Sequence, residues 1–276
     1  MIRYSPKIDL VFRKLFGSEE NKVILLSLVN SILNFRSPIK DLTIKNPYNL
    51  ATYVGGKTSI LDIKAVDENG TWYDIELQIG EQGFYGKRAL YYLSKMYVDQ
   101  LENAEQFSLL NKTIGIHLID FKYFYDERYA RHFVYKDNET NEYDENLSYQ
   151  QLYFIELSKF NKDWSESRTL LERWVTFLNR AHRLEKGEIP QEIAGDSEMV
   201  MAAKKLDEMS FTREELEIYE SERKKRMDAQ EELRTALEKG KDEGRKEGRE
   251  EGLDQALKKM ISSGITEIDA KRILGL

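Results

Sequence analysis

The chain has 276 residues, of which 33% are charged, 41% are hydrophobic and 11% are aromatic, and its formal net charge is −7. This composition is typical of a folded globular protein, and no apolar run approaches the roughly 18 residues that a membrane span requires. The absence of cysteine excludes disulfide bonds, thiolate metal sites and cysteine nucleophiles. Because the first residues lack the apolar segment of a signal peptide, we expect a cytoplasmic protein with no membrane partner.

The negative charge is concentrated in the later part of the chain. Residues 1–100 carry 13 Lys or Arg and 11 Asp or Glu, so this part is slightly basic. Residues 206–259 carry 17 acidic and 13 basic side chains. A net negative charge disfavours nucleic acid as a partner, but the slightly basic charge of residues 1–100 is compatible with it.

The hydrophobic pattern of residues 1–190 predicts several helices and strands. Ser5 and Pro6 are suited to begin the first helix, which we expect to end at Gly17. Further helices are predicted at 22–33, 84–101 and 168–184. Strands are predicted at 41–45, 59–66, 71–79, 113–121, 132–135 and 149–157. This order indicates an α/β or α+β domain in which helices flank a central sheet.

Residues 191–276 are predicted to form a charged helical tail. Within it, glycine recurs every fourth residue over 240–252, at Gly240, Gly244, Gly248 and Gly252. Such a stripe on a helix lets a second helix approach closely, which would support a homodimer or a higher oligomer. Because glycine destabilises helices and the charge is dense, we favour a frayed, solvated connector. Residues 256–276 are predicted to form a helical hairpin that is broken at Gly264.

Motifs for several other chemistries do not fit. Residues 80–88 resemble a phosphate-binding loop, but the glycine spacing is one residue too long and Arg88 stands where Ser or Thr should bind magnesium. The three histidines, His117, His132 and His182, form no metal-ligand pair in the sequence. We therefore expect each histidine to be a packed or a surface residue.

Two neighbouring segments, 61–65 and 73–79, alternate apolar and polar residues with the period of a strand. Between them, residues 68–70 have the sequence Glu-Asn-Gly, which is suited to a three-residue hairpin loop. This loop fixes the register of the two strands and predicts three facing pairs: Asp62 with Glu76, Lys64 with Asp74, and Ile60 with Gln78.

Facing residues share one side of a sheet, so the side chains of Asp62 and Glu76 should lie close together. Two facing carboxylates repel each other unless a positive charge lies between them. Lys64 or a divalent cation such as Mg²⁺ could supply that charge. A solvated sheet face with a surface ion pair between Lys64 and Asp74 explains the same alternation, and the pattern alone leaves both interpretations open.

At these residues the chain resembles the PD-(D/E)XK nuclease superfamily, and more closely its recombination-promoting nuclease (Rpn) or transposase family. The resemblance covers most of the chain, and the segments that carry it are 9–17, 60–65, 74–78, 88–97, 116–121 and 154–160. It implies a restriction-endonuclease-like core with a mixed central sheet flanked by helices, and DNA as the substrate. It also implies Mg²⁺ or Mn²⁺ as the cofactor, and a role in recombination, transposition or defence against mobile elements.

The resemblance also implies roles for individual residues. Asp62 and Glu76 would bind the metal, and Asp9 on the first helix is a further candidate ligand. Gln78 stands where the superfamily has a lysine that helps to activate the attacking water and to stabilise charge. We therefore expect Gln78 to position water or phosphate, and Lys64 to replace part of the missing positive charge.

The helix that follows the hairpin carries candidate DNA contacts. We expect Lys87, Arg88 and Lys95 to bind the DNA backbone, which requires no base specificity. Tyr91 and Tyr92 on the same helix are expected to pack within the protein rather than to stack on bases.

Three hypotheses of function follow. The first is a metal-dependent endonuclease that hydrolyses DNA phosphodiester bonds. The second is a catalytically inactive DNA-binding or interaction protein on a nuclease fold, because a fold does not fix a function and the motif lysine is missing. The third is an assembly module in which the helical tail is the functional part.

Overall fold

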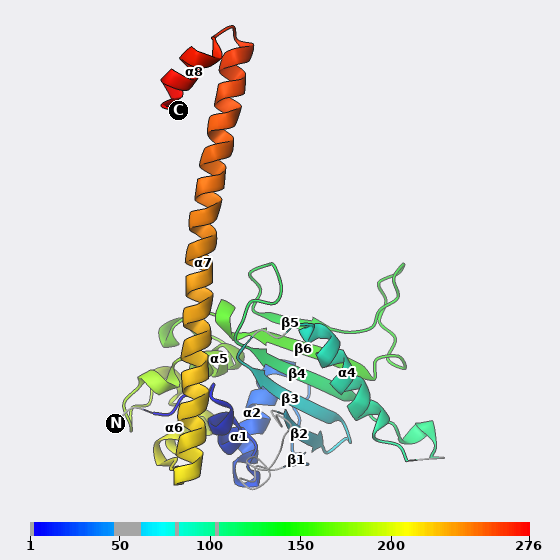
Figure 1. The fold of residues 1–276 in the computed structure, drawn as a ribbon. Helices are drawn as coiled ribbons and strands as arrows, with labels where there is room; N and C mark the ends of the chain where they lie inside the picture. Colours follow the sequence, from blue (N-terminus) through cyan, green and yellow to red (C-terminus); the bar gives the residue numbers. More distant parts are fainter. Residues whose placement is uncertain (1–2, 47–61, 81–82, 103–104) are drawn as a thin grey trace. The chain divides into compact units, whose positions relative to one another are not determined.

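The computed structural model describes residues 3–46, 62–80, 83–102 and 105–276 (Figure 1). The chain divides into two compact units, Met1–Arg223 and Lys224–Leu276.

The first unit is built on a sheet of six strands in the order β1-β2-β3-β4-β6-β5 (Figure 1). β4 pairs in parallel with β3 and with β6, and the other neighbouring strands pair antiparallel. The sheet is therefore mixed, as expected. The strands are β1 (Leu42–Ile44), β2 (Asp62–Asp67), β3 (Trp72–Gln78), β4 (Thr113–Ile119), β5 (Ala130–Phe133) and β6 (Gln150–Glu156).

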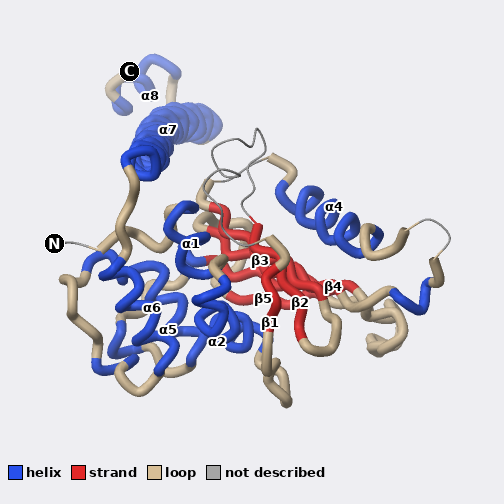
Figure 2. The backbone as a smooth tube through the Cα atoms, turned by 90° about the horizontal axis from the view of Figure 1, so that it is seen from below, coloured by secondary structure: helices blue, strands red, loops and turns tan. Residues whose placement is uncertain are grey.

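Helices cover both faces of this sheet. α1, α2, α5 and α6 lie on one face, and α4 lies on the opposite face (Figure 2). Their bounds are α1 (Asp9–Phe16), α2 (Lys22–Leu33), α4 (Tyr85–Val98), α5 (Leu170–Arg180) and α6 (Ser197–Glu208). A mixed sheet between two helical layers agrees with the PD-(D/E)XK fold predicted from the sequence.

The two faces of the sheet enter two separate cores because side chains alternate along each strand. The larger core contains Ile63, Ile75 and Ile116 from the sheet, together with the apolar faces of α1, α2, α5 and α6. The smaller core lies beneath α4 and contains Tyr85, Ala89, Leu93, Ile119, Leu152 and Phe154. The polar residues of β3 that alternate with its core residues therefore face α4 rather than open water.

The first helix begins later than Ser5 and Pro6 predict. The chain makes a turn in which the Ile8 N–H donates to the Ser5 carbonyl at 3.0 Å, and α1 then starts at Asp9. Ile8 is the residue before the helix and has an extended backbone (φ −82°, ψ 130°), while its side chain is buried in the larger core. Because Ile8 is buried in this extended conformation, the helix cannot begin before Asp9.

The compact unit extends beyond residue 190 to Arg223. Residues 191–223, which we predicted to belong to the tail, bury Met199 and Leu206 of α6 and Tyr219 of α7 (Arg213–Ser262) in the larger core. An ion pair of 2.8 Å between Lys14 and Glu215 joins α1 to the start of α7. In the sequence these apolar residues stand among many charged ones, so the pattern did not indicate a core. The domain boundary lies near Arg223 rather than near residue 190.

The second unit contains most of α7 (Arg213–Ser262) and all of α8 (Glu267–Leu274). The helix continues through the four glycines, in place of the frayed connector that we favoured, and the space around each glycine is open. Gly264 adopts φ +93° between the two helices, and the Thr266 side chain accepts from the Asp269 N–H to begin α8. Of the helices in the described ranges, none combines the length and apolarity needed to cross a membrane.

Candidate active site

The β2–β3 hairpin has the predicted register. Asp62 is the Cα partner of Glu76, and Lys64 is the Cα partner of Asp74. The loop is held by Asp67, whose side-chain Oδ1 accepts from the Asn69 and Thr71 N–H groups at 2.9 and 2.8 Å. Gly70 adopts φ +83°, a conformation that few other residues adopt without strain. The third predicted pair includes Ile60, which lies outside the described residues.

Glu76 is a buried carboxylate with partners on two other elements. Its side-chain Oε1 accepts from Arg88 Nη2 of α4 at 2.9 Å. Its Oε2 lies 3.2 Å from His117 Nδ1 of β4 and 3.5 Å from the Tyr85 hydroxyl. Because α4 covers this face of the sheet, Glu76 is only 3% exposed. The alternative interpretation, in which this sheet face is solvated, therefore does not hold for Glu76.

The surroundings of Glu76 favour its ionised form. Burial by itself raises the pKa of a carboxyl group, because the charged form loses water. For Glu76 this effect is outweighed by the hydrogen bond to His117 and by the charges of His117 and Arg88, so its pKa lies below the usual value. The site therefore holds a buried negative charge at neutral pH.

Gln78 lies two residues further along β3 and is also buried. Its side-chain Oε1 accepts from the same Arg88 Nη2 at 2.6 Å, and its Nε2 donates to the Gly80 carbonyl at 3.0 Å. One guanidinium nitrogen thus bonds one oxygen of Glu76 and one of Gln78. Both oxygens lie within 2.9 Å of a single cationic group, so this pair of oxygens is arranged to receive a cation.

Arg88 is placed by the amphipathic pattern of α4. Tyr85, Ala89 and Leu93 are buried against the sheet, which brings Arg88 to the edge of the buried face. Its guanidinium also lies 5.0 Å from the centre of the Tyr85 ring. The side chain predicted to bind DNA phosphates is thus engaged by Glu76 and Gln78, whereas Lys87 and Lys95 are exposed on the same helix.

His117 and Tyr85 are members of the site that sequence reasoning did not find. His117 is the Cα partner of Glu76 in the parallel pair of β3 and β4, and it is 1% exposed. Its ring stacks on Phe154 at 5.0 Å, and its Nδ1 lies 3.0 Å from the Tyr85 hydroxyl. Spacing along the sequence carries no signal for this contact. A correct alignment of β3 with β4 would have revealed it.

The other two predicted site residues, Asp9 and Lys64, lie on α1 and on β2. Asp9 is the first residue of α1 and is buried. Just before it, Lys7 forms an ion pair of 2.8 Å with Asp120, whose N–H donates to the Gln78 carbonyl at 2.9 Å. The start of α1 is thereby anchored at the end of β3. Lys64 is half-buried on β2, on the same sheet face as Glu76 by register.

Among the described side chains, no three His, Asp or Glu residues gather closely enough to hold a metal ion. The backbone of Asp62 is described, but its side chain lies outside the described part. The candidate ligands of a metal ion at this site are the carboxylates of Asp62 and Glu76 and the amide oxygen of Gln78. Carboxylate and amide oxygens are the ligands that Mg²⁺ prefers, so these residue types fit such an ion.

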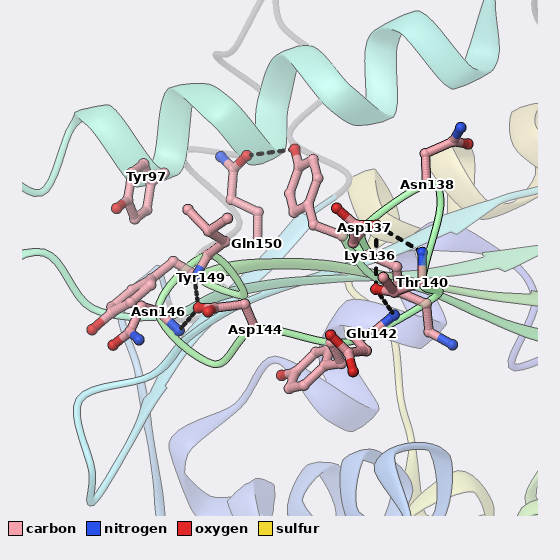
Figure 3. A pocket seen from close by; sticks show the side chains of 13 residues that line it. Tyr97, Lys136, Asp137, Asn138, Thr140, Glu142, Asp144, Asn146, Tyr149 and Gln150 are labelled. Carbon is pink, nitrogen blue, oxygen red and sulfur yellow. Dashed lines mark hydrogen bonds between the residues drawn. The ribbon is translucent and has the colours of Figure 1, made fainter.

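One hollow in the described part of the structure lies away from these residues. It has a volume of about 910 Å³ and is formed by Tyr97 of α4 and by residues 135–150 (Figure 3). Its carboxylates Asp137 and Asp144 accept hydrogen bonds from nearby backbone N–H groups and so stabilise their own loop. We assign no chemistry to this hollow.

Comparison with known families gives one match. A family model described as PD-(D/E)XK nuclease family transposase matches residues 6–236, which is well over half of the chain and includes every residue of the site. No curated protein and no solved structure matches the chain.

Proposed function

Since the chain belongs to the PD-(D/E)XK nuclease family transposases, we propose that it is an endonuclease that hydrolyses DNA phosphodiester bonds with Mg²⁺ or Mn²⁺. We propose recombination, transposition or defence against mobile elements as its biological setting. The observation that carries this proposal is the buried, ionised Glu76, which is paired in register with Asp62 and shares a partner with Gln78.

Asp62, Glu76 and Gln78 would hold the metal ion through two carboxylates and one amide oxygen. When bound there, Mg²⁺ supplies Lewis-acid polarisation of the phosphate and lowers the pKa of a bound water. His117 of β4 and Tyr85 of α4 contact Oε2 of Glu76 and so fix the direction of this carboxylate. Asp9 remains a further candidate ligand, supported by the anchoring of α1 at the end of β3.

Arg88 supplies the positive charge that the superfamily pattern places on a lysine. Its guanidinium is held beside Glu76 and Gln78, where negative charge develops on a phosphate under attack. Lys64 adds a second positive charge on the same sheet face. The exposed Lys87 and Lys95 of α4 contact the DNA backbone without reading sequence.

A second candidate is a catalytically inactive DNA-binding protein on the same fold. It is favoured by one observation, namely that oxygens of both Glu76 and Gln78 are engaged by Arg88. In such a protein the arginine permanently neutralises the motif carboxylate. Replacement of Asp62 by alanine would then leave DNA binding unchanged.

The test is cleavage of supercoiled plasmid by the purified chain with Mg²⁺, with Mn²⁺ or with EDTA. We expect metal-dependent nicking that is lost in Asp62→Ala and in Glu76→Gln. Glu20→Gln, which changes an exposed carboxylate with a long ion pair to Lys205 of 3.4 Å, is the matched control and should nick as the wild type does. Absence of nicking with either metal, together with retained DNA binding, would support the inactive binding protein.

We further propose that residues 224–276 bring copies of the chain together as a homodimer or a higher oligomer. Support comes from exposed apolar side chains in this unit, which include Leu237, Ile261 and Ile273. The open space around the four glycines also leaves room for a second helix. Light scattering of the full chain and of a chain that ends at Arg223 tests this proposal, and an equal number of copies in both would contradict it.

A further inference from the structure

The outer face of α4 carries aromatic and basic side chains in alternation. Lys87, Tyr91, Lys95 and Val98 follow one another at spacings of three and four residues and share one side of the helix, and Phe84 directly precedes the helix. All five are exposed, while the opposite side of α4 is buried against the sheet. Figure 2 shows α4 on the side of the sheet opposite to α1, α2, α5 and α6.

We propose that this face binds unpaired bases of a single-stranded DNA segment, with Tyr91 as the stacking platform and Lys87 and Lys95 as phosphate contacts. The proposal rests on the proposed nuclease function and narrows its substrate class. The preferred substrate would be DNA in which a single strand lies beside the scissile bond, such as a fork, a flap or an unwound end.

The charge of α4 is complementary to a polyanion. The helix has the sequence YGKRALYYLSKMYV, with three basic residues and no acidic one, in a chain whose net charge is −7. Lys95 is paired with Asp99 at 3.4 Å, and both side chains are more than half exposed, so a phosphate group can replace this weak contact. Lys87 lies 5.1 Å from the centre of the Phe84 ring, which places a cation beside an aromatic face.

The aromatic side chains distinguish unpaired bases from a duplex. Tyr91 is 63% exposed and Phe84 is 79% exposed, contrary to the internal packing that we expected for the tyrosines. The Tyr91 and Tyr92 rings contact each other edge to face at 5.4 Å, which keeps Tyr91 beside a neighbouring ring at the surface. Unpaired bases present open faces that stack on such rings, whereas bases inside a duplex are already stacked on one another.

The stacking face and the active site are joined through one helix. Arg88, which bonds Glu76 and Gln78, precedes Tyr91 by three residues, or about 4.5 Å along the helix axis. A strand that lies on the outer face of α4 therefore lies on the helix that supplies Arg88 to the site, while Glu76 and Gln78 lie beneath that helix. This shared helix favours a nucleic acid over a protein partner.

The test is binding of fluorescein-labelled DNA to the full chain in EDTA, measured by anisotropy. The probes are a thymidine oligomer of about 20 nucleotides, which covers the site sizes of such surfaces, and a duplex of equal length. We expect tighter binding of the single strand. Tyr91→Ala should weaken it by roughly tenfold, as expected for the loss of one stacking contact.

Three variants separate stacking from other effects. Tyr91→Phe keeps the ring and should bind the single strand within about twofold of the wild type, because stacking needs the ring rather than the hydroxyl. Phe35→Ala, which removes an exposed aromatic residue outside α4, is the matched control and should bind as the wild type does. Lys87→Ala should weaken both probes and reduce their salt dependence.

Several results would overturn the proposal. It fails if the single strand binds no tighter than the duplex, or if Tyr91→Ala binds it as the wild type does. It also fails if Tyr91→Ala changes the number of copies in solution while DNA binding stays unchanged, since the face would then be a contact between chains. Plasmid nicking by the wild type is measured separately, so the nuclease proposal stands or falls independently of this result.

Discussion

Arg88 Nη2 of α4 donates to Glu76 Oε1 of β3 at 2.9 Å and so joins this helix to the motif strand beneath it. The same nitrogen donates to Gln78 Oε1 at 2.6 Å. Glutamine at this position thus accepts a hydrogen bond from a cation, whereas a lysine there would itself carry the charge. A positive charge therefore lies beside the Glu76 carboxylate, but Arg88 of α4 supplies it in place of a lysine on β3.

Replacement of Arg88 tests whether this charge acts in catalysis. We expect Arg88→Ala to slow plasmid nicking roughly 100-fold at saturating Mg²⁺, because removal of one charge-stabilising donor has effects of that order. Arg88→Lys should restore part of the rate, since it keeps the charge but carries it on a flexible chain that lacks the rigid planar guanidinium. Arg213→Ala, at an arginine whose side chain is 92% exposed, is the control. Faster nicking by Arg88→Ala would mean that the arginine blocks the site.

His117 is expected to act by holding Glu76 in place. His117→Phe keeps the ring that stacks on Phe154 but removes the nitrogen that contacts Glu76 Oε2. Loss of a group that orients a metal ligand lowers metal affinity by roughly tenfold or more. We therefore expect weaker Mn²⁺ binding, which isothermal calorimetry measures without DNA or turnover.

Two variants make this second prediction specific. Tyr85→Phe removes the longer contact of 3.5 Å and should have a smaller effect on Mn²⁺ binding. His132→Gln changes a histidine that stacks on Tyr153, on the other face of the sheet, and should bind Mn²⁺ as the wild type does. Unchanged Mn²⁺ affinity in His117→Phe would remove His117 from the site.

The local part of the site is readable in the sequence, because a tight turn and a two-residue period fix which residues face each other. Glu68, Asn69 and Gly70 determine the register, and the pairing of Asp62 with Glu76 follows from them. The contacts of Glu76 with Arg88 and His117 are different. They join residues 12 and 41 positions apart, and depend on where α4 packs and how β3 aligns with β4.

The same distinction explains the domain boundary. Ile193, Met199 and Leu206 are apolar residues in a charged segment, and they are buried in the larger core, where α6 packs against α1 and α2. No local signal in the sequence reports this packing. The strands, by contrast, were located to within a few residues, since an alternating apolar pattern reflects burial on a nearby sheet.

Truncation tests the position of this boundary. A chain that ends at Arg223 should keep its free energy of unfolding to within about 1 kcal/mol, because it retains both cores. A chain that ends at residue 190 loses Ile193, Met199, Leu206 and Tyr219 from the larger core. Each buried side chain contributes about 1.5–3 kcal/mol, so the sum approaches the whole stability of a typical domain.

Urea denaturation followed by circular dichroism compares the two truncated chains. We expect a cooperative transition for the chain that ends at Arg223, and a loss of cooperativity or of solubility for the shorter chain. Equal stability of both chains would show that α6 and the start of α7 are not integral parts of the fold.

The ion pair between Arg3 and Asp207 predicts a dependence of stability on pH. Arg3 is buried and donates from Nε and Nη2 to the two Asp207 carboxylate oxygens at 2.6 and 2.9 Å. The hydrogen bonds from Arg3 hold the pKa of Asp207 below its usual value of 3.8. A carboxyl whose pKa is lowered in the folded state contributes stability above the unfolded value, and this contribution is lost as the pH falls through the folded pKa.

Asp207→Asn should therefore lower the free energy of unfolding by about 2 kcal/mol at neutral pH, the usual loss for a hydrogen bond to a charged group. The difference between wild type and variant should stay constant down to about pH 4 and shrink at lower pH, as Asp207 of the wild type takes up its proton. Urea unfolding across this pH range provides the measurement. Glu20→Gln, at an exposed carboxylate whose ion pair with Lys205 is long at 3.4 Å, is the control and should leave the free energy of unfolding nearly unchanged. A difference between wild type and Asp207→Asn that does not change with pH would mean that packing, rather than the charge of Asp207, stabilises this contact.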